Sequence, residues 1–232
     1  DLALDAGLTA LTGETGAGKS ILLDAVALAL GAGLFLPFEA WFRPGYSQVK
    51  AWSGLQTDLG SYLVHWGWQL FLIISWFIWE TREWLASTPA SVVHKIKPYL
   101  GYLQVVGLLF LLVLFLLTLM GISIGWLVGI LGVWAAILLF RPNQADGKRL
   151  VLFMVGTGLV LTLFVELFAL EGDIGRMNTV FKFYYQAWLL WSLAAAFGVA
   201  VMLQDLRRVW NIIYRLGLAI VLLMALVYPV LG

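Results

Sequence analysis

The sequence predicts an all-α fold, a polytopic transmembrane bundle of about six helices. Of its 232 residues, 62% are hydrophobic and only 12% are charged, with a mean hydropathy of +0.94. A soluble domain carries about 25% charged residues, so too few charges are present here to cover a surface that faces water. The 12 Trp residues suit the headgroup level of a bilayer, where indole rings gather.

Long apolar runs provide the second observation, because each of them matches the hydrocarbon thickness of a membrane. At about 1.5 Å rise per residue, a helix of about 20 residues crosses a core of about 30 Å. So many runs in a short chain leave no polar layer that could bury them in a soluble protein. The runs, and therefore the expected helices, are 63–79, 101–120, 122–140, 150–170, 184–203 and 213–231.

Lys and Arg in the connections predict the orientation of the bundle. The connections 80–99, 141–149 and 204–215 carry most of these residues, so we assign them to the cytoplasmic side. The segments 34–62 and 171–183 then share the outer face. We expect a multi-pass protein of the cell membrane, with membrane lipids as its immediate partners.

The chain divides into three zones by composition. Residues 1–33 are typical of a soluble strand–loop–helix segment, and residues 34–62 of an interfacial or extracytoplasmic segment with Pro and Gly. Residues 63–232 form the transmembrane domain. An alternative is that residues 21–38 span the membrane as well, despite Asp24. The chain begins at Asp1 without an initiator Met, so we expect a fragment of a longer protein.

The first zone contains a full P-loop pattern, G-x-x-x-x-G-K-[ST]. In such a loop, glycines turn backbone N–H groups towards phosphate oxygens, the lysine reaches the outer phosphates, and the hydroxyl holds Mg²⁺. The residues of the pattern are Gly13, Gly16, Gly18, Lys19 and Ser20. The phrase GLTALTGETGAGKSILLDAVALALGAG resembles the opening of RecN-type, SMC-like DNA-repair ATPases, which implies ATP binding with Mg²⁺ as a cofactor.

Other parts of an ATPase are missing from the sequence. No hydrophobic strand ending in a Walker-B Asp follows the loop, and only one strand is available to build the sheet that would hold it. We therefore expect ATP and Mg²⁺ only if the P-loop is functional, and ATP hydrolysis is not expected. The simplest reading is that residues 1–33 are a fusion or misassembly of unrelated coding sequence.

Polar side chains gather at the entrance of the fifth expected helix. Asn178, Lys182 and Gln186 are spaced by four residues and so share a helical face, with Arg176 just ahead. Ionisable groups at membrane depth are costly, and they usually pair or mark a site. Two interpretations remain open, a site for a lipid phosphate or sugar, or ion pairs that lock two helices together. The candidate residues are Glu166, Asp173, Arg176, Asn178, Lys182 and Gln186.

The stretch from Arg176 to Trp188, RMNTVFKFYYQAW, resembles the signature of the Chlor_Arch_YYY family, an uncharacterised family of bacterial and archaeal membrane proteins. The resemblance covers about residues 34–232. The architecture of that family is similar to that of GT-C glycosyltransferases, which implies transfer of a sugar from a polyprenyl-phosphate carrier on the outer face. Such enzymes place a catalytic acid in the first outer loop, so no catalytic residue is assigned here.

Several classes of function are excluded or weakened. The chain has no Cys and only two distant His residues, so no metal site is expected. A net charge of +1 gives no reason to expect nucleic acid as a partner. Ordinary loop or interfacial roles suit Glu39, Asp58, His65 and His94. Three functions stay open, namely a glycosyltransferase-like enzyme portion, a P-loop ATP-binding fragment, and a non-catalytic scaffold or transporter portion.

Overall fold

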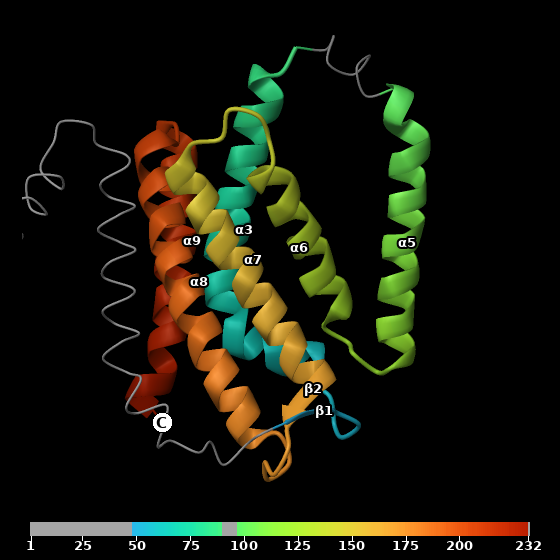
Figure 1. Ribbon diagram of the computed structural model, residues 1–232. Helices are drawn as coiled ribbons and strands as arrows, with labels where there is room; N and C mark the ends of the chain where they lie inside the picture. The colour runs from blue at the N-terminus through green and yellow to red at the C-terminus, as the bar shows by residue number, and fades with distance from the viewer. Residues whose placement is uncertain (1–47, 90–96, 232) are drawn as a thin grey trace, which may run out of the picture. The chain divides into compact units, whose positions relative to one another are not determined.

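The computed structural model describes residues 48–89 and 97–231, and within them it is mostly helical, as expected (Figure 1). Six α-helices are joined by short connections, with one 3₁₀ turn, η1 (Lys97–Tyr99), ahead of α5. The helices are α3 (Leu59–Ser87), α5 (Leu100–Leu119), α6 (Gly125–Leu139), α7 (Asp146–Leu167), α8 (Met177–Asp205) and α9 (Arg208–Leu231).

Five helical segments of this region are long and apolar enough to cross a membrane. The sixth, α6, is apolar but has only 15 residues. This supports a multi-pass membrane protein. The expected ends of the helices were wrong in several places, since α3 and α8 each run for 29 residues. Helix α8 begins at Met177, seven residues earlier than the apolar run at 184–203 indicated.

A small sheet replaces the end of one expected helix. The run 150–170 was predicted as a single helix, but α7 ends at Leu167, and β2 (Phe168–Leu170) pairs antiparallel with β1 (Val49–Ala51). Lys50 faces Ala169 in the register of this ladder. The hydrogen bonds of the ladder come from a strand more than a hundred residues away, so local apolarity could not reveal them.

Two polar caps define where the long helices begin. The Asp58 carboxylate accepts a hydrogen bond of 3.0 Å from the Ser61 N–H, which satisfies one of the free donors at the start of α3. The Asp173 carboxylate accepts from the N–H groups of Asn178 at 3.2 Å and Thr179 at 2.8 Å, and so caps α8. Both helices therefore begin where a carboxylate is available and not where the apolar run begins.

Aromatic side chains fill the core between α3, α7 and α8. Trp66, Trp76 and Trp191 are fully buried, and the ring of Trp66 meets that of Trp191 edge-on at 5.0 Å between centroids. The Trp191 indole donates to the Val155 carbonyl at 3.1 Å, which satisfies its polar atom across the interface with α7. Gly158 of α7 lies directly against this indole.

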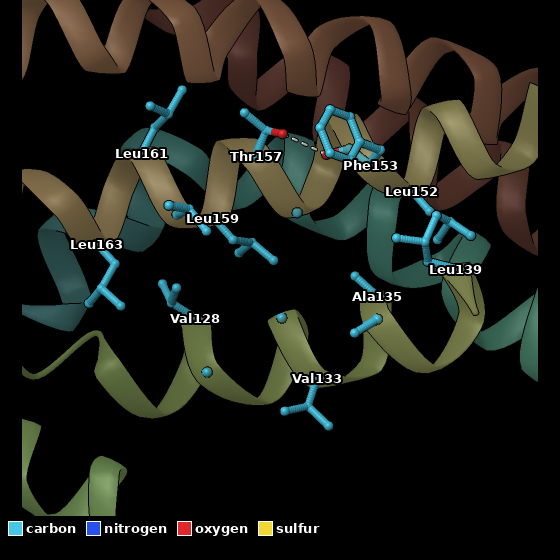
Figure 2. Close-up of a pocket in the computed structure, with 15 residues that line it drawn as sticks. Val128, Val133, Ala135, Leu139, Leu152, Phe153, Thr157, Leu159, Leu161 and Leu163 are labelled. Atoms are coloured by element: carbon cyan, nitrogen blue, oxygen red, sulfur yellow. Dashed lines mark hydrogen bonds between the residues drawn. The ribbon is translucent and has the colours of Figure 1, made fainter. Parts of the chain in front are cut away.

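Helices α5 and α9 bury little surface within the structure, so most of their apolar side chains are available to lipid tails. A groove of about 550 Å³ between α6 and α7 is also apolar (Figure 2). Figure 2 shows Val128 and Leu163 in one part of it and Ala135 and Leu139 in another. The hydroxyl of Thr157 in the lining is already used, because it donates to the Phe153 carbonyl at 2.9 Å. The groove is therefore better suited to hydrocarbon than to water.

The alternating helices give the bundle two distinct ends (Figure 1). One end, which we call the sheet end, holds β1, β2, the start of α3 and the start of α8. The other, the basic end, holds the end of α3 and the connections 140–145 and 206–207. Most of the described Lys and Arg residues lie at the basic end, which is the end that the sequence assigns to the cytoplasm.

The contact between Gly158 and Trp191 can be tested by adding a methyl group. A Cβ at position 158 would come within 2.2 Å of the Trp191 indole nitrogen, which cannot move freely in the core. We expect Gly158→Ala to lower the free energy of unfolding in detergent by about 1–3 kcal/mol. Gly156→Ala on the same helix is the control, because nothing lies within 4 Å of its added Cβ. Equal stability of the two variants would contradict this packing.

Candidate functional site

Two of the predicted site residues meet at the sheet end. Glu166 lies in the last turn of α7, and Arg176 is the residue that immediately precedes α8. The Arg176 Nη1 atom lies 2.9 Å from Glu166 Oε1, and the Glu166 side chain is fully buried. The structure therefore brings these two candidate residues together as an ion pair. An Arg beside a buried carboxylate compensates a charge that would otherwise be very costly to desolvate.

A third element closes this ion pair. The Thr57 N–H donates to Glu166 Oε2 at 2.9 Å, and the Thr57 hydroxyl donates to Oε1 at 2.6 Å. Arg176 Nη2 donates to the same hydroxyl at 3.0 Å, and Nη1 donates to the Val165 carbonyl at 2.7 Å. With its amide nitrogen turned towards Glu166, Gln56 adds a further hydrogen bond of 2.8 Å to Oε2. Thr57 and Gln56 were not foreseen from the sequence.

The segment ahead of α3 is thus fixed to the end of α7. Trp52 N–H donates to the Leu167 carbonyl at 2.8 Å, which extends the β1–β2 ladder, and the Arg176 guanidinium lies 5.6 Å from the centre of the Trp52 ring. Such a cation–π contact adds to the hold on Arg176. The polar atoms of the pair are directed at one another and at this segment, so the arrangement favours the structural role among the two that the sequence left open.

Asp173 serves the start of α8. Besides the two backbone N–H groups, it accepts a hydrogen bond of 2.8 Å from the Thr179 hydroxyl. Desolvation raises the pKa of the Asp173 carboxyl, but the hydrogen bonds from Thr179 and Asn178 together lower it more, so the pKa lies below its ordinary value. These contacts make Asp173 a helix cap, and a role in binding a ligand stays a prediction.

Asn178, Lys182 and Gln186 all lie in the first half of α8, so their spacing does place them on one face. The side chains of Lys182 and Gln186 are exposed in the described structure, and Asn178 is half-buried. We call these three residues the polar face of α8. Its side chains point away from the core residues Ala187 and Trp191, which are fully buried on the opposite side of the helix. That this face binds a ligand stays a prediction.

An aromatic pocket of about 420 Å³ adjoins the same part of α8. It lies between the first half of α8 and the beginning of α3, where the His65 ring lies 5.7 Å from that of Tyr184. The sequence assigned His65 to interfacial anchoring, and the structure adds that it faces other rings. The pocket is lined by His65, Met177, Val180, Phe181, Tyr184, Tyr185 and Trp188.

Other predicted residues cannot be placed. The P-loop residues Gly13, Gly16, Gly18, Lys19 and Ser20 lie outside the described residues, as do Glu39 and His94. Nucleotide binding there therefore stays a prediction. Within residues 48–89 and 97–231, no group of three or more His, Asp or Glu side chains is close enough to hold a metal ion.

A second buried ion cluster lies at the basic end and was missed from the sequence. Glu80, placed by the apolar pattern in a connection, belongs to the last turns of α3 and is buried. Arg141 Nη2 lies 3.0 Å from Glu80 Oε2, and Lys148 also pairs with this carboxylate. Arg141 further donates to the Glu80 carbonyl at 3.2 Å. Glu80 directly follows the apolar run 63–79 and continues its helical spacing. This continuity is the sequence signal that would have placed Glu80 in α3.

Breaking the pair at the sheet end tests its structural role. Arg176→Met removes the cation and leaves the Glu166 carboxylate buried without compensation, so we expect the free energy of unfolding in detergent to fall by about 3–5 kcal/mol. Lys50→Met, which removes an exposed cation from the neighbouring strand, should cost less than about 0.5 kcal/mol. Adding Glu166→Gln to Arg176→Met should recover part of the loss. Equal, small effects of Arg176→Met and Lys50→Met would contradict this role.

Comparison with protein families identifies the one to which the chain belongs. The family described as "Uncharacterized membrane protein (DUF2298)" matches residues 5–191, a range that includes the P-loop-like segment from residue 5 onward, α3 to α7 and the first half of α8. No curated protein and no solved structure matches the chain. The resemblances to GT-C glycosyltransferases and to RecN-type ATPases are not supported by these comparisons. The expectation of an uncharacterised membrane family is confirmed, and the chain belongs to the DUF2298 family of membrane proteins.

Proposed function

We propose that the chain is the membrane portion of an enzyme that transfers a sugar from a polyprenyl-phosphate carrier, and that the polar face of α8 binds the phosphate and sugar of the donor. In such a transfer, the bond between the anomeric carbon and the phosphate oxygen breaks, and the lipid phosphate leaves. An acceptor hydroxyl forms the new bond and loses its proton. The binding step is the part to which the described residues contribute.

The single observation that carries the proposal is the position of Lys182. It is an ionisable side chain exposed on a helix that is apolar enough to span a membrane. Ionisable residues in membrane-spanning segments are rare, and they usually pair with other groups or mark a site for a polar substrate. Lys182 is five residues from the start of α8, or about 8 Å along the helix, which is within reach of a headgroup at the membrane surface.

The neighbours of Lys182 suit the sugar and the isoprenoid chain of the donor. Amide groups such as those of Asn178 and Gln186 donate and accept hydrogen bonds, as recognition of sugar hydroxyls requires. Tyr185, three residues after Lys182, is its neighbour on the helix surface and also lines the aromatic pocket. That pocket offers an apolar surface for the first isoprene units or for the face of a sugar ring.

Arg176 has a different role in this proposal from the one that the sequence suggested. Its guanidinium is engaged by Glu166, Thr57 and the Val165 carbonyl, so it positions the start of α8 and does not itself bind the donor. The sheet end then holds the binding face rigidly, as a preorganised site needs.

Removal of the Lys182 charge tests the proposal. We expect Lys182→Gln, purified in detergent, to bind a polyprenyl-phosphate sugar at least about tenfold more weakly, which corresponds to about 1.4 kcal/mol. The matched control is Lys97→Gln, which removes the same charge at the basic end and should leave affinity unchanged. Unfolding curves for both variants separate loss of binding from loss of structure. Affinity for the donor that is the same in Lys182→Gln as in the wild type would rule out this face as the phosphate site.

A further inference from the structure

A polar pocket opens at the basic end, away from the polar face of α8. It has a volume of about 620 Å³ and lies between the last turns of α3, the start of α7 and the end of α8. Trp79 of α3 forms part of its wall, and Arg207, in the connection between α8 and α9, contributes an exposed cation. None of the functions considered so far uses this pocket.

The inner part of the pocket holds two cations around one carboxylate. Arg141 and Lys148 both pair with Glu80, whose side chain is only 1% exposed, whereas theirs are 13% and 31% exposed. One carboxylate therefore compensates two positive charges in a partly dehydrated place. Positive charge that is left over in such surroundings attracts a further anion more strongly than it would in water.

The rim does not cancel this excess. Arg82 and Glu83 pair with each other at 3.6 Å, and Arg207 and Asp205 bring one charge of each sign. The cations that line the pocket thus exceed the carboxylates by one. These cations come from α3, from α7 and from the connections that precede α7 and α9, and all of them line the same pocket.

The place of the pocket indicates which anion reaches it. The Arg82 guanidinium lies 5.3 Å from the centre of the Trp79 ring, and both sit where α3 leaves its apolar run. Trp at the end of a membrane-spanning helix marks the headgroup level. Basic pockets between helices at that level hold the phosphates of anionic lipids, and Arg pairs with phosphate in a bidentate manner.

We propose that this pocket binds the phosphate group of an anionic phospholipid, through hydrogen bonds from Arg207 and Lys148. Arg141 adds its charge only, because its nitrogen atoms already contact Glu80 and Gln144. The bound lipid completes the charge balance that Glu80 leaves open and links α3, α7 and α8 at this end of the bundle. The site is independent of the proposed donor site, because it lies at the opposite end of the helices.

The experiment uses the full chain, purified in detergent, and native mass spectrometry to measure retained lipid. Phosphatidylglycerol is the anionic probe, phosphatidylcholine is the zwitterionic comparison, and millimolar inorganic phosphate is a separate competitor. The principal variant is Arg207→Gln, because Arg207 has an exposed side chain on the rim and its removal leaves the Glu80 pairs intact. Lys148→Gln is the second variant, and Arg149→Gln, outside the pocket but on the same turn of α7, is the control.

We expect wild type and Arg149→Gln to retain phosphatidylglycerol at least about tenfold better than phosphatidylcholine. Arg207→Gln should reduce that preference by about threefold or more, and Lys148→Gln should reduce it further. Equal retention of the two lipids, or an unchanged preference in Arg207→Gln, would overturn the proposal. Saturable binding of inorganic phosphate that displaces no lipid, and that is lost in Arg207→Gln, would also overturn it, since the pocket would then serve a soluble anion.

Discussion

The hydrocarbon region of a membrane contains no water to form hydrogen bonds with a polar group. This constraint accounts for where the polar side chains of this protein lie. Each buried charge in the described bundle has an opposite charge or hydrogen-bond donors beside it. Glu166 is the most demanding case, because its fully buried carboxylate is satisfied by Arg176, Thr57 and Gln56 together. Loss of any one donor would leave part of that charge uncompensated. The pair thus makes the segment before α3, the end of α7 and the start of α8 depend on one another.

The same constraint operates at the opposite end of the bundle with a different outcome. At the sheet end the ion pair is closed, since its donors and acceptors are directed at protein groups. At the basic end a single carboxylate serves two cations that are themselves partly exposed, and this excess of positive charge is the reason for the anion site that we propose there. Closed pairs fix structure, and open clusters are suited to ligands. By this criterion Glu166 and Arg176 support the fold, whereas the pocket at the basic end is better placed for binding.

The sequence was sufficient for the helices but not for their ends. Apolar runs reveal which segments lipid can surround, and each of the six runs lies mostly within a helix. Their boundaries depend on specific partners, as in the caps at Asp58 and Asp173 and the pairing of β2 with β1. Ion pairing near the start of α8 was one of the two interpretations that the sequence left open, and Glu166 and Arg176 do form such a pair. Thr57 lies 109 residues from Glu166, and nothing local in the sequence connects the two. Glu80 was missed because a charge after an apolar run looks like the end of a helix.

A membrane-spanning bundle requires that its sheet end and its basic end lie on opposite sides of the membrane. Because the chain has no Cys, single Cys variants can measure this directly. Single variants Ser53→Cys at the sheet end, Ala145→Cys at the basic end and Leu112→Cys in the middle of α5 place one thiol each at exposed positions. Labelling of intact cells with a membrane-impermeant maleimide should modify Ser53→Cys only, and Ala145→Cys should react after the cells are opened. Leu112→Cys should resist labelling in both conditions. Labelling of both ends from the same side, or ready labelling of Leu112→Cys, would contradict the bundle as a membrane-spanning structure.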